Sequence, residues 1–162
     1  QVWVARGGTL PRPWPAPEIT EIAPGFTFEG DGWKLTSARA THAQPILECL
    51  GFAVEHAGKK FVYSGDTGIN KNITALCKDA DFLLHWCYRG SGEQVHPALM
   101  AMSPDPAEVA IMAENAGVKR LFLTHFRIHM DGDNVHVAAH RDLAQHFSGD
   151  SGIVEDLREY SI

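Results

Sequence analysis

The sequence predicts an α/β fold in which a β-hairpin is followed by alternating strands and helices packed in layers. Two segments, "WKLTSARATH" and "LGFAVEHA", roughly alternate apolar and polar residues, as half-buried strands do. Two later segments, "DFLLHW" and "VKRLFLTH", are short runs with apolar centres, which is typical of buried strands. Segments with helical periodicity separate these later strands. This order of elements indicates a layered α/β domain.

Residues 1–32 are expected to form an extended, proline-rich arm or linker. Within this arm, residues 6–17 contain four prolines and two glycines. Proline fixes φ and has no backbone N–H, so such a composition disfavours both a helix and a central strand. Residues 33–162 are then expected to form the α/β half-domain.

A strand that begins at Trp33 leads into a hairpin, whose turn we expect at residues 58–60. The next segment, "INKNITALCKDA", has four residues on one helical stripe: Ile69, Ile73, Leu76 and Cys77. A helix is therefore expected between the hairpin and the strand "DFLLHW".

Residues 88–102 are expected to be irregular and to precede a second helix. Ser103 and Pro104 form a suitable N-cap and first helical residue, and Gly117 is a suitable C-terminal stop. After the strand "VKRLFLTH" and a polar loop, residues 135–147 predict a third helix. The final segment, "GIVEDLREYSI", is expected to be a strand.

The composition disfavours several classes of partner. A formal net charge of −6 and a pI near 5.8 give no large cationic surface, so nucleic acid is not the expected partner. No apolar run is long enough for a membrane span.

The three cysteines form no Cys-x-x-Cys pair, which favours reduced thiols and a cytoplasmic location. Because the chain opens on Gln1 and not on methionine, a processed or truncated N-terminus is possible.

Three residues that can bind metals each end an apolar strand: His42, Asp66 and His125. Strand ends form a rim on which side chains from distant parts of a chain converge. Imidazole and carboxylate together suit zinc, and manganese and iron are also compatible with these ligands. Gly65 permits a close backbone approach just before the Asp66 carboxylate. The sequence therefore predicts a cation at this rim, bound by the three residues.

Other roles are open for these residues and for the remaining histidines. Asp66, in "GDTG", could instead bond its own backbone in a turn, and either His42 or His125 could be a hydrogen-bonded structural residue. His85 also ends a strand but is interpreted as a buried, hydrogen-bonded histidine. Three histidines are weaker candidates for contact with a substrate: His85, His96 and His129.

With these residues in place, the chain resembles the metallo-β-lactamase superfamily, in particular its ribonuclease Z and arylsulfatase-like branch. The resemblance covers about residues 18–162 and rests on "ATHAQPILECLGFAVEHAGKKFVYSGDT", "DADFLLHW" and "SPDPAEVAIMAENAGVKRLFLTHF" in that order. It implies the C-terminal half of an αββα sandwich. It also implies that His42 binds a first metal, Asp66 bridges both metals, and His125 binds the second. A metal-activated water would then attack an ester-type centre.

The chain departs from the family pattern in ways that bear on function. The superfamily's His-x-His-x-Asp-His motif is absent, so the chain is expected to be the C-terminal half of a larger protein. Ser103 stands where ribonuclease Z relatives have a histidine, and Trp86 stands where a glutamate is common. Only 23 residues separate His42 from Asp66, whereas tRNA-processing members insert a long arm there.

These departures favour a hydrolase that acts on a small phosphoester, sulfate ester or lactone. Two alternatives stay open. One is a non-catalytic half-domain that serves as a binding or assembly module, partnered by the missing half or by a second copy of itself. The other is a fragment of a tRNA 3′-processing endonuclease.

Overall fold

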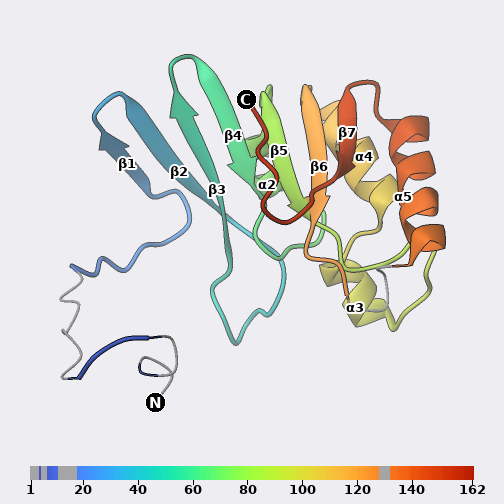
Figure 1. The fold of residues 1–162 in the computed structure, drawn as a ribbon, viewed down its shortest axis with the longest axis horizontal. Helices are drawn as coiled ribbons and strands as arrows, with labels where there is room; N and C mark the ends of the chain where they lie inside the picture. Colours follow the sequence, from blue (N-terminus) through green and yellow to red (C-terminus); the bar gives the residue numbers. More distant parts are fainter. Residues whose placement is uncertain (1–3, 5–6, 11–17, 128–131) are drawn as a thin grey trace.

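A mixed sheet forms the centre of the protein. The computed structural model describes residues 4, 7–10, 18–127 and 132–162, except the side chain at position 133. Within them the sheet has seven strands in the order β1-β2-β3-β4-β5-β6-β7 (Figure 1). The strands are β1 (Thr27–Gly30), β2 (Trp33–Arg39), β3 (Leu50–His56), β4 (Lys59–Tyr63), β5 (Phe82–Trp86), β6 (Arg120–Thr124) and β7 (Asp150–Ile153). The α/β fold class predicted from the sequence is confirmed.

The first four strands pair antiparallel, and β4 to β7 pair parallel. The β3–β4 turn consists of Ala57 and Gly58, which have φ values of 48° and 75°. Two residues with positive φ form the tight hairpin turn that matches strand twist. The turn therefore begins earlier than the predicted residues 58–60.

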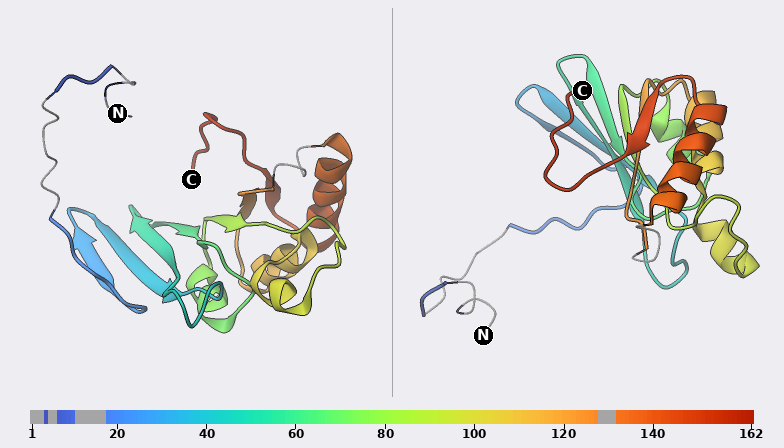
Figure 2. Two further views of the ribbon diagram at one scale, coloured as in Figure 1. Left: turned by 90° about the horizontal axis from the view of Figure 1, so that it is seen from below. Right: turned by 45° about the vertical axis from the view of Figure 1, so that its right-hand side comes forward.

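Helices α2 (Lys71–Cys77), α4 (Pro106–Asn115) and α5 (Asp133–His146) cover one face of the sheet. The short helix α3 (Pro97–Met102) lies at the end of the sheet (Figure 1). In Figure 2 α2, α4 and α5 lie on one side of the sheet, and the C-terminal segment crosses the other. Leu83, Leu121 and Leu123 point into the helix-facing core, where they are fully buried with Val109 and Leu143.

The start of α4 differs from the sequence prediction. The Asp105 side chain accepts a hydrogen bond from the Glu108 N–H, and the Glu108 side chain accepts one from the Asp105 N–H, which forms a capping box. Pro106 is therefore the first helical residue, not Pro104. Ser103 is instead the C-cap of α3, a short helix in the segment predicted to be irregular.

The two ends of the described chain also differ from the elements expected there. β1 pairs with β2 inside the range 1–32, which the sequence assigns to an arm. The final strand β7 ends at Ile153, and the remaining chain leaves the sheet. Tyr160 then packs on Phe82 and Phe122, at ring-centroid distances of 6.2 Å and 4.9 Å. The tail thus covers part of the sheet face opposite the helices.

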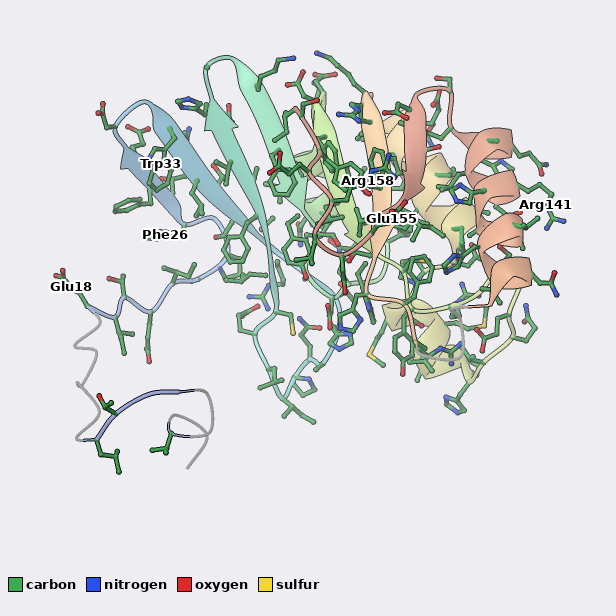
Figure 3. All side chains as sticks on the ribbon, in the orientation of Figure 1. Glu18, Phe26, Trp33, Arg141, Glu155 and Arg158 are labelled. Carbon is green, nitrogen blue, oxygen red and sulfur yellow. The ribbon has the colours of Figure 1, made fainter. Side chains whose placement is uncertain are left out.

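That opposite face is rich in apolar and aromatic side chains. Because side chains alternate along a strand and paired residues share a face, one face carries Phe52, Val54, Phe61, Tyr63, Leu84 and Phe122. At its far edge Phe28 and Trp33 are 53% and 37% exposed. Figure 3 shows Trp33 on the β1–β2 side of the molecule and Arg141 on the opposite side, on α5.

Candidate functional site

Four strands end at the same edge of the sheet and bring the three candidate ligands and Trp86 there. β2 and β4 are each antiparallel to β3, so they run in one direction, and β5 and β6 run parallel to β4. His42, Asp66 and His125 follow β2, β4 and β6, and Trp86 is the last residue of β5. The fold therefore places the three predicted ligands on one rim, as expected.

The Asp66 carboxylate and the His125 imidazole form the closest pair on this rim. Asp66 Oδ2 lies 4.0 Å from His125 Nε2, and both side chains are partly exposed, at 36% and 54%. Two ligands of a shared tetrahedral zinc lie about 3.4 Å apart, for bond lengths of about 2.1 Å. The donor types and their spacing thus fit a cation held between these two side chains after a small closure.

Among the described residues, no hydrogen bond joins the Asp66 carboxylate to its own turn. The carboxylate lies near the His125 ring, and its charge acts on Tyr63. The alternative in which Asp66 caps its own backbone is thus not seen.

His42 lies on the same rim, against the indole of Trp86. The two ring centroids are 4.9 Å apart and the rings meet edge to face. His42 Nδ1 is buried and has no hydrogen-bond partner among the described residues. A buried nitrogen without a partner fits a ligand position, because buried polar atoms are almost always paired.

The three predicted ligands do not converge on one point. Among residues 18–127 and 132–162, no group of three or more His, Cys, Asp or Glu side chains is arranged to hold a metal ion. The assignment of His42, Asp66 and His125 as metal ligands therefore stays a prediction, with the Asp66–His125 pair as its best-formed part.

Hydrogen bonds join the two loops that carry His42 and Asp66. The Thr41 N–H donates to Thr67 Oγ1 at 2.9 Å, and the Gly68 N–H donates to the Thr41 carbonyl at 2.9 Å. Gln44 supports the first loop by accepting from the His42 N–H and donating to the Ala40 carbonyl. These bonds fix the spacing of the two loops.

The backbone at the site is unusual at two positions. Gly65 has φ of 63°, and a Cβ there would lie 2.3 Å from the Leu50 carbonyl oxygen. Only glycine fits so close an approach, as the sequence predicts for this position. His125 has φ of 61°, a left-handed conformation that is uncommon for histidine. Such strain is concentrated at functional sites in proteins.

A cavity opens beside His125 on the sheet face opposite the helices. Its volume is about 690 Å³, and its wall includes Tyr63, Leu84, Thr124, His125 and Phe126. Burial, followed by the negative charge of Asp66, raises the pKa of the Tyr63 hydroxyl. Tyr63 therefore remains a neutral hydrogen-bond donor at the edge of the cavity.

The weaker histidine candidates lie elsewhere or outside the described residues. His85 is fully buried on the helix-facing side, where Nδ1–H donates to the Trp86 carbonyl at 2.7 Å and Nε2 has no partner among the described residues. Burial lowers the pKa of His85 to about 4. The burial predicted for His85 is confirmed.

His96 caps α3 by accepting from the Ala98 N–H. His129 lies outside the described residues.

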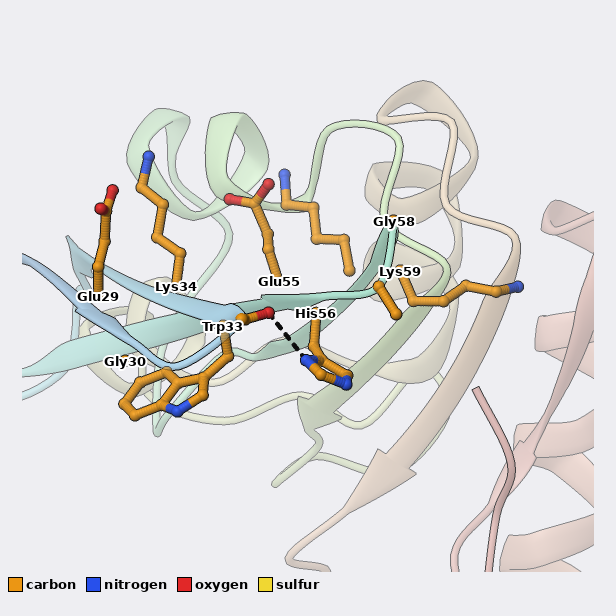
Figure 4. Close-up of a pocket in the computed structure, with 11 residues that line it drawn as sticks. Glu29, Gly30, Trp33, Lys34, Glu55, His56, Gly58 and Lys59 are labelled. Carbon is orange, nitrogen blue, oxygen red and sulfur yellow. Dashed lines mark hydrogen bonds between the residues drawn. The ribbon is translucent and has the colours of Figure 1, made fainter.

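A second cavity, of about 430 Å³, lies at the other end of β2 to β4 (Figure 4). Trp33, His56 and Gly58 line it, and His56 Nδ1 bonds the Gly32 carbonyl at 2.9 Å. Because Trp33 begins β2 and His56 ends β3, this cavity is at the sheet edge opposite the candidate ligands. It takes no part in the candidate site.

The sequence interpretation did not identify Tyr63 or Thr67 as members of the site. Tyr63 is the last residue of β4, and it faces the cavity because strand side chains alternate. That alternation could have indicated Tyr63. The bond between Thr67 and Thr41 joins two loops distant in the sequence, and no local pattern predicts it.

Known proteins resemble this chain in sequence. The family model described as beta-lactamase superfamily domain matches residues 3–126. Ribonuclease Z of Mycobacterium sp. (strain KMS) is 32% identical over 117 residues, which cover 69% of this chain and 41% of the relative. A zinc phosphodiesterase ELAC protein 2 homolog of Caenorhabditis elegans is 28% identical over 100 residues, which cover 62% of this chain and 12% of the relative. The chain spans less than half the length of these curated relatives.

Solved structures resemble it in fold. The metallo-beta-lactamase fold protein YhfI from Bacillus subtilis superposes with a TM-score of 0.69 at 21% identity, covering 83% of this chain and 52% of that one. Human tRNase Z, short form, gives a TM-score of 0.61 at 23% identity, covering 83% and 45%. The predicted resemblance to the metallo-β-lactamase superfamily and to ribonuclease Z is confirmed. The chain belongs to the metallo-β-lactamase superfamily, in its ribonuclease Z-like branch.

Proposed function

We propose that this chain is part of a metal-dependent hydrolase that acts on a small ester-type substrate: a phosphoester, a sulfate ester or a lactone. The observation that carries the proposal is the 4.0 Å separation between Asp66 Oδ2 and His125 Nε2 on the rim of the sheet. Membership of a superfamily of hydrolases supports it, as does the cavity beside His125.

Each side chain of the site has a distinct role in this proposal. Asp66 and His125 would hold a divalent cation, with zinc first and manganese or iron as alternatives. A bound cation supplies a polarised ester oxygen and a water that ionises near neutral pH. Tyr63 donates a hydrogen bond to the substrate, and Leu84 and Phe126 exclude bulk water from the cavity.

Metal binding is tested by thermal unfolding of the chain with zinc, manganese or iron added. A native state that binds zinc is stabilised by about 2.7 kcal/mol when zinc is at 100 times its Kd. Asp66→Asn keeps the shape of the side chain and removes its charge, so it should abolish this stabilisation. Asp31→Asn, in the exposed β1–β2 turn, is the matched control. An equal zinc response in all three proteins would contradict the proposal.

The substrate class is tested with chromogenic esters. The metal-loaded chain should hydrolyse a nitrophenyl phosphodiester, a nitrophenyl sulfate or a lactone, and Asp66→Asn should not. The absence of a long insertion between His42 and Asp66, and the net charge of −6, favour such small substrates over tRNA.

A second candidate is tRNA 3′ processing, favoured by the relatives that are named ribonuclease Z and tRNase Z. Those names weaken the expectation that nucleic acid is not a partner. Incubating the metal-loaded chain with a precursor tRNA separates the candidates. Cleavage at the 3′ end without ester hydrolysis would replace the first proposal.

A third candidate is a binding or assembly module without catalysis. The exposed aromatic rings of Phe28 and Trp33 favour it, because exposed apolar surface often marks a contact with another protein. Size-exclusion chromatography over a range of concentrations is the test. Self-association in a chain that neither binds zinc nor hydrolyses esters would support the module.

Among residues 18–127 and 132–162, no helix is long and apolar enough to cross a bilayer.

A further inference from the structure

The indole of Trp86 makes a directional contact with the candidate ligand His125. Its Nε1–H donates a hydrogen bond to His125 Nδ1 at 2.9 Å. Trp86 is only 2% exposed, and its ring also packs on His42 and on Tyr88, at centroid distances of 4.9 Å and 5.4 Å. These contacts fix the orientation of the indole, so its N–H is directed at His125 Nδ1.

This bond determines where the hydrogen lies on the neutral His125 ring. The indole nitrogen is only a donor, so His125 Nδ1 must present its lone pair. In a neutral imidazole the hydrogen is then on Nε2, the nitrogen that lies 4.0 Å from Asp66 Oδ2. Neither nitrogen has a free lone pair: one is used by Trp86, and the other carries the hydrogen.

Histidine ligands in metal sites usually have the opposite arrangement. The nitrogen that does not bind the metal donates its N–H to a carboxylate or a carbonyl, which fixes the coordinating tautomer. Here Trp86 offers a donor where a metal-bound His125 needs an acceptor. With a cation on Nε2, the Nδ1–H would face the indole N–H at hydrogen-bonding distance.

We infer that Trp86 is a positioning residue that holds His125 in the Nε2–H tautomer and so weakens cation binding between Asp66 and His125. This role rests on the proposed metal-dependent function, because it requires a cation at that pair. A cation can bind through Nε2 only when the Trp86–His125 bond breaks. Cation binding would thus be weak and would require loss of the Trp86–His125 hydrogen bond, although Trp86 itself contacts no metal.

The first test reads the tautomer directly in the wild-type chain. Nitrogen-15 NMR of the metal-free protein, above the pH at which the ring is charged, distinguishes hydrogen on Nδ1 from hydrogen on Nε2. We expect His125 to carry its hydrogen on Nε2. A His125 resonance pattern with the hydrogen on Nδ1 would overturn the inference without any mutation.

The second test compares zinc affinity by calorimetry in four variants. Trp86→Phe keeps an aromatic ring and removes the donor, so zinc should bind about fivefold tighter. Trp86→Gln adds an acceptor, and zinc should bind at least about tenfold tighter. Trp33→Phe removes an exposed indole at the far end of β2 and should leave the affinity unchanged. Asp66→Asn should remove binding, which locates the zinc at this pair.

The outcomes separate this inference from the proposed function. Zinc binding of equal strength in wild type, Trp86→Phe and Trp86→Gln would overturn the inference and leave the metal site standing. No zinc binding in any variant would overturn both. Circular dichroism and thermal midpoints of the Trp86 variants check that each is folded before its affinity is compared.

Discussion

Thr67 Oγ1 accepts a hydrogen bond from the Thr41 N–H at 2.9 Å, and this bond ties the loop of His42 to the loop of Asp66. The Thr67 hydroxyl also donates to the Gly68 carbonyl and accepts from the Asn70 side chain. Thr67 is fully buried, so water cannot replace these bonds. One hydroxyl thus sets the distance between two candidate ligand loops.

Replacing Thr67 by valine should destabilise the protein and loosen the site. The Thr41 N–H would lose its acceptor, and because this bond is part-buried the loss costs about 1–2 kcal/mol. Urea unfolding measures this loss. Thr36→Val, at a half-buried position in β2, is the matched control and should change the unfolding free energy by less than about 0.5 kcal/mol. Similar losses in both variants would contradict a special role for Thr67.

Gly65→Ala should be among the most damaging small substitutions in the chain. The added Cβ would lie 2.3 Å from the Leu50 carbonyl oxygen, at a φ of 63°. The left-handed conformation alone costs about 1 kcal/mol for alanine, and the clash with the backbone should raise the total loss to roughly 3 kcal/mol or more.

Gly58→Ala separates the cost of the left-handed backbone from the cost of the clash with the Leu50 carbonyl. Gly58 also has positive φ, at 75°, but nothing lies within 4 Å of the position that an added methyl group would take. Its unfolding free energy should therefore fall by only about 1 kcal/mol. Equal losses at both glycines would show that the Leu50 carbonyl moves aside freely.

Much of the sheet follows from local patterns in the sequence. Alternation of apolar and polar residues located β2 and β3, and apolar runs located β5 and β6, because a strand buried on both faces needs such a run. β1 was missed, since "TFEG" is too short and too polar to show alternation. The last eleven residues were expected to be a strand, but only the first two of them, Gly152 and Ile153, pair with β6. Contacts of Tyr160 across the sheet decide the course of the tail, and these are not local.

In the candidate site, too, local patterns predicted some features, and contacts between distant residues decided the others. Strand-end positions predicted that His42, Asp66 and His125 would converge on one cation. Asp66 and His125 lie 4.0 Å apart, but no group of three such side chains is arranged to hold a metal ion among the described residues. The hydrogen bond from Trp86 to His125 could not be predicted, because it depends on the direction of an indole N–H relative to a ring that follows another strand. The family resemblance indicated only that Trp86 stands where a glutamate is common.

Arg89 should stabilise the junction between β5 and the helices α3 and α4. Its side chain is 2% exposed, donates to the Ser103 and Glu93 carbonyls, and pairs with Glu108 and with Asp105. Arg89→Met would leave these acceptors without their donor, at a cost of about 3 kcal/mol. Arg141→Met, which removes a 70% exposed side chain paired with Asp142, should cost under about 0.5 kcal/mol. Urea unfolding of both variants measures these losses of unfolding free energy. A loss below about 1 kcal/mol for Arg89→Met would contradict this role.

Acid should destabilise the protein through His85. Burial lowers the pKa of His85 from 6.5 to about 4 in the folded state. The unfolded chain therefore binds more protons between pH 6.5 and 4, and the unfolding free energy falls as the pH falls through that window. The stability that depends on a neutral His85 is fully present above pH 6.5 and is lost below pH 4. The unfolding free energy changes by about 3 kcal/mol across this window.

Urea unfolding at intervals from pH 7 to pH 4 measures this dependence. His85→Gln cannot titrate, so its unfolding free energy should fall less steeply over the same range. His140→Gln, on the exposed face of α5, is the matched control and should keep the wild-type slope. Carboxylates such as Asp81, whose pKa is lowered chiefly by its hydrogen bond with Lys119, contribute equally to all three proteins. Parallel curves for wild type and His85→Gln would therefore mean that His85 accepts its proton without unfolding.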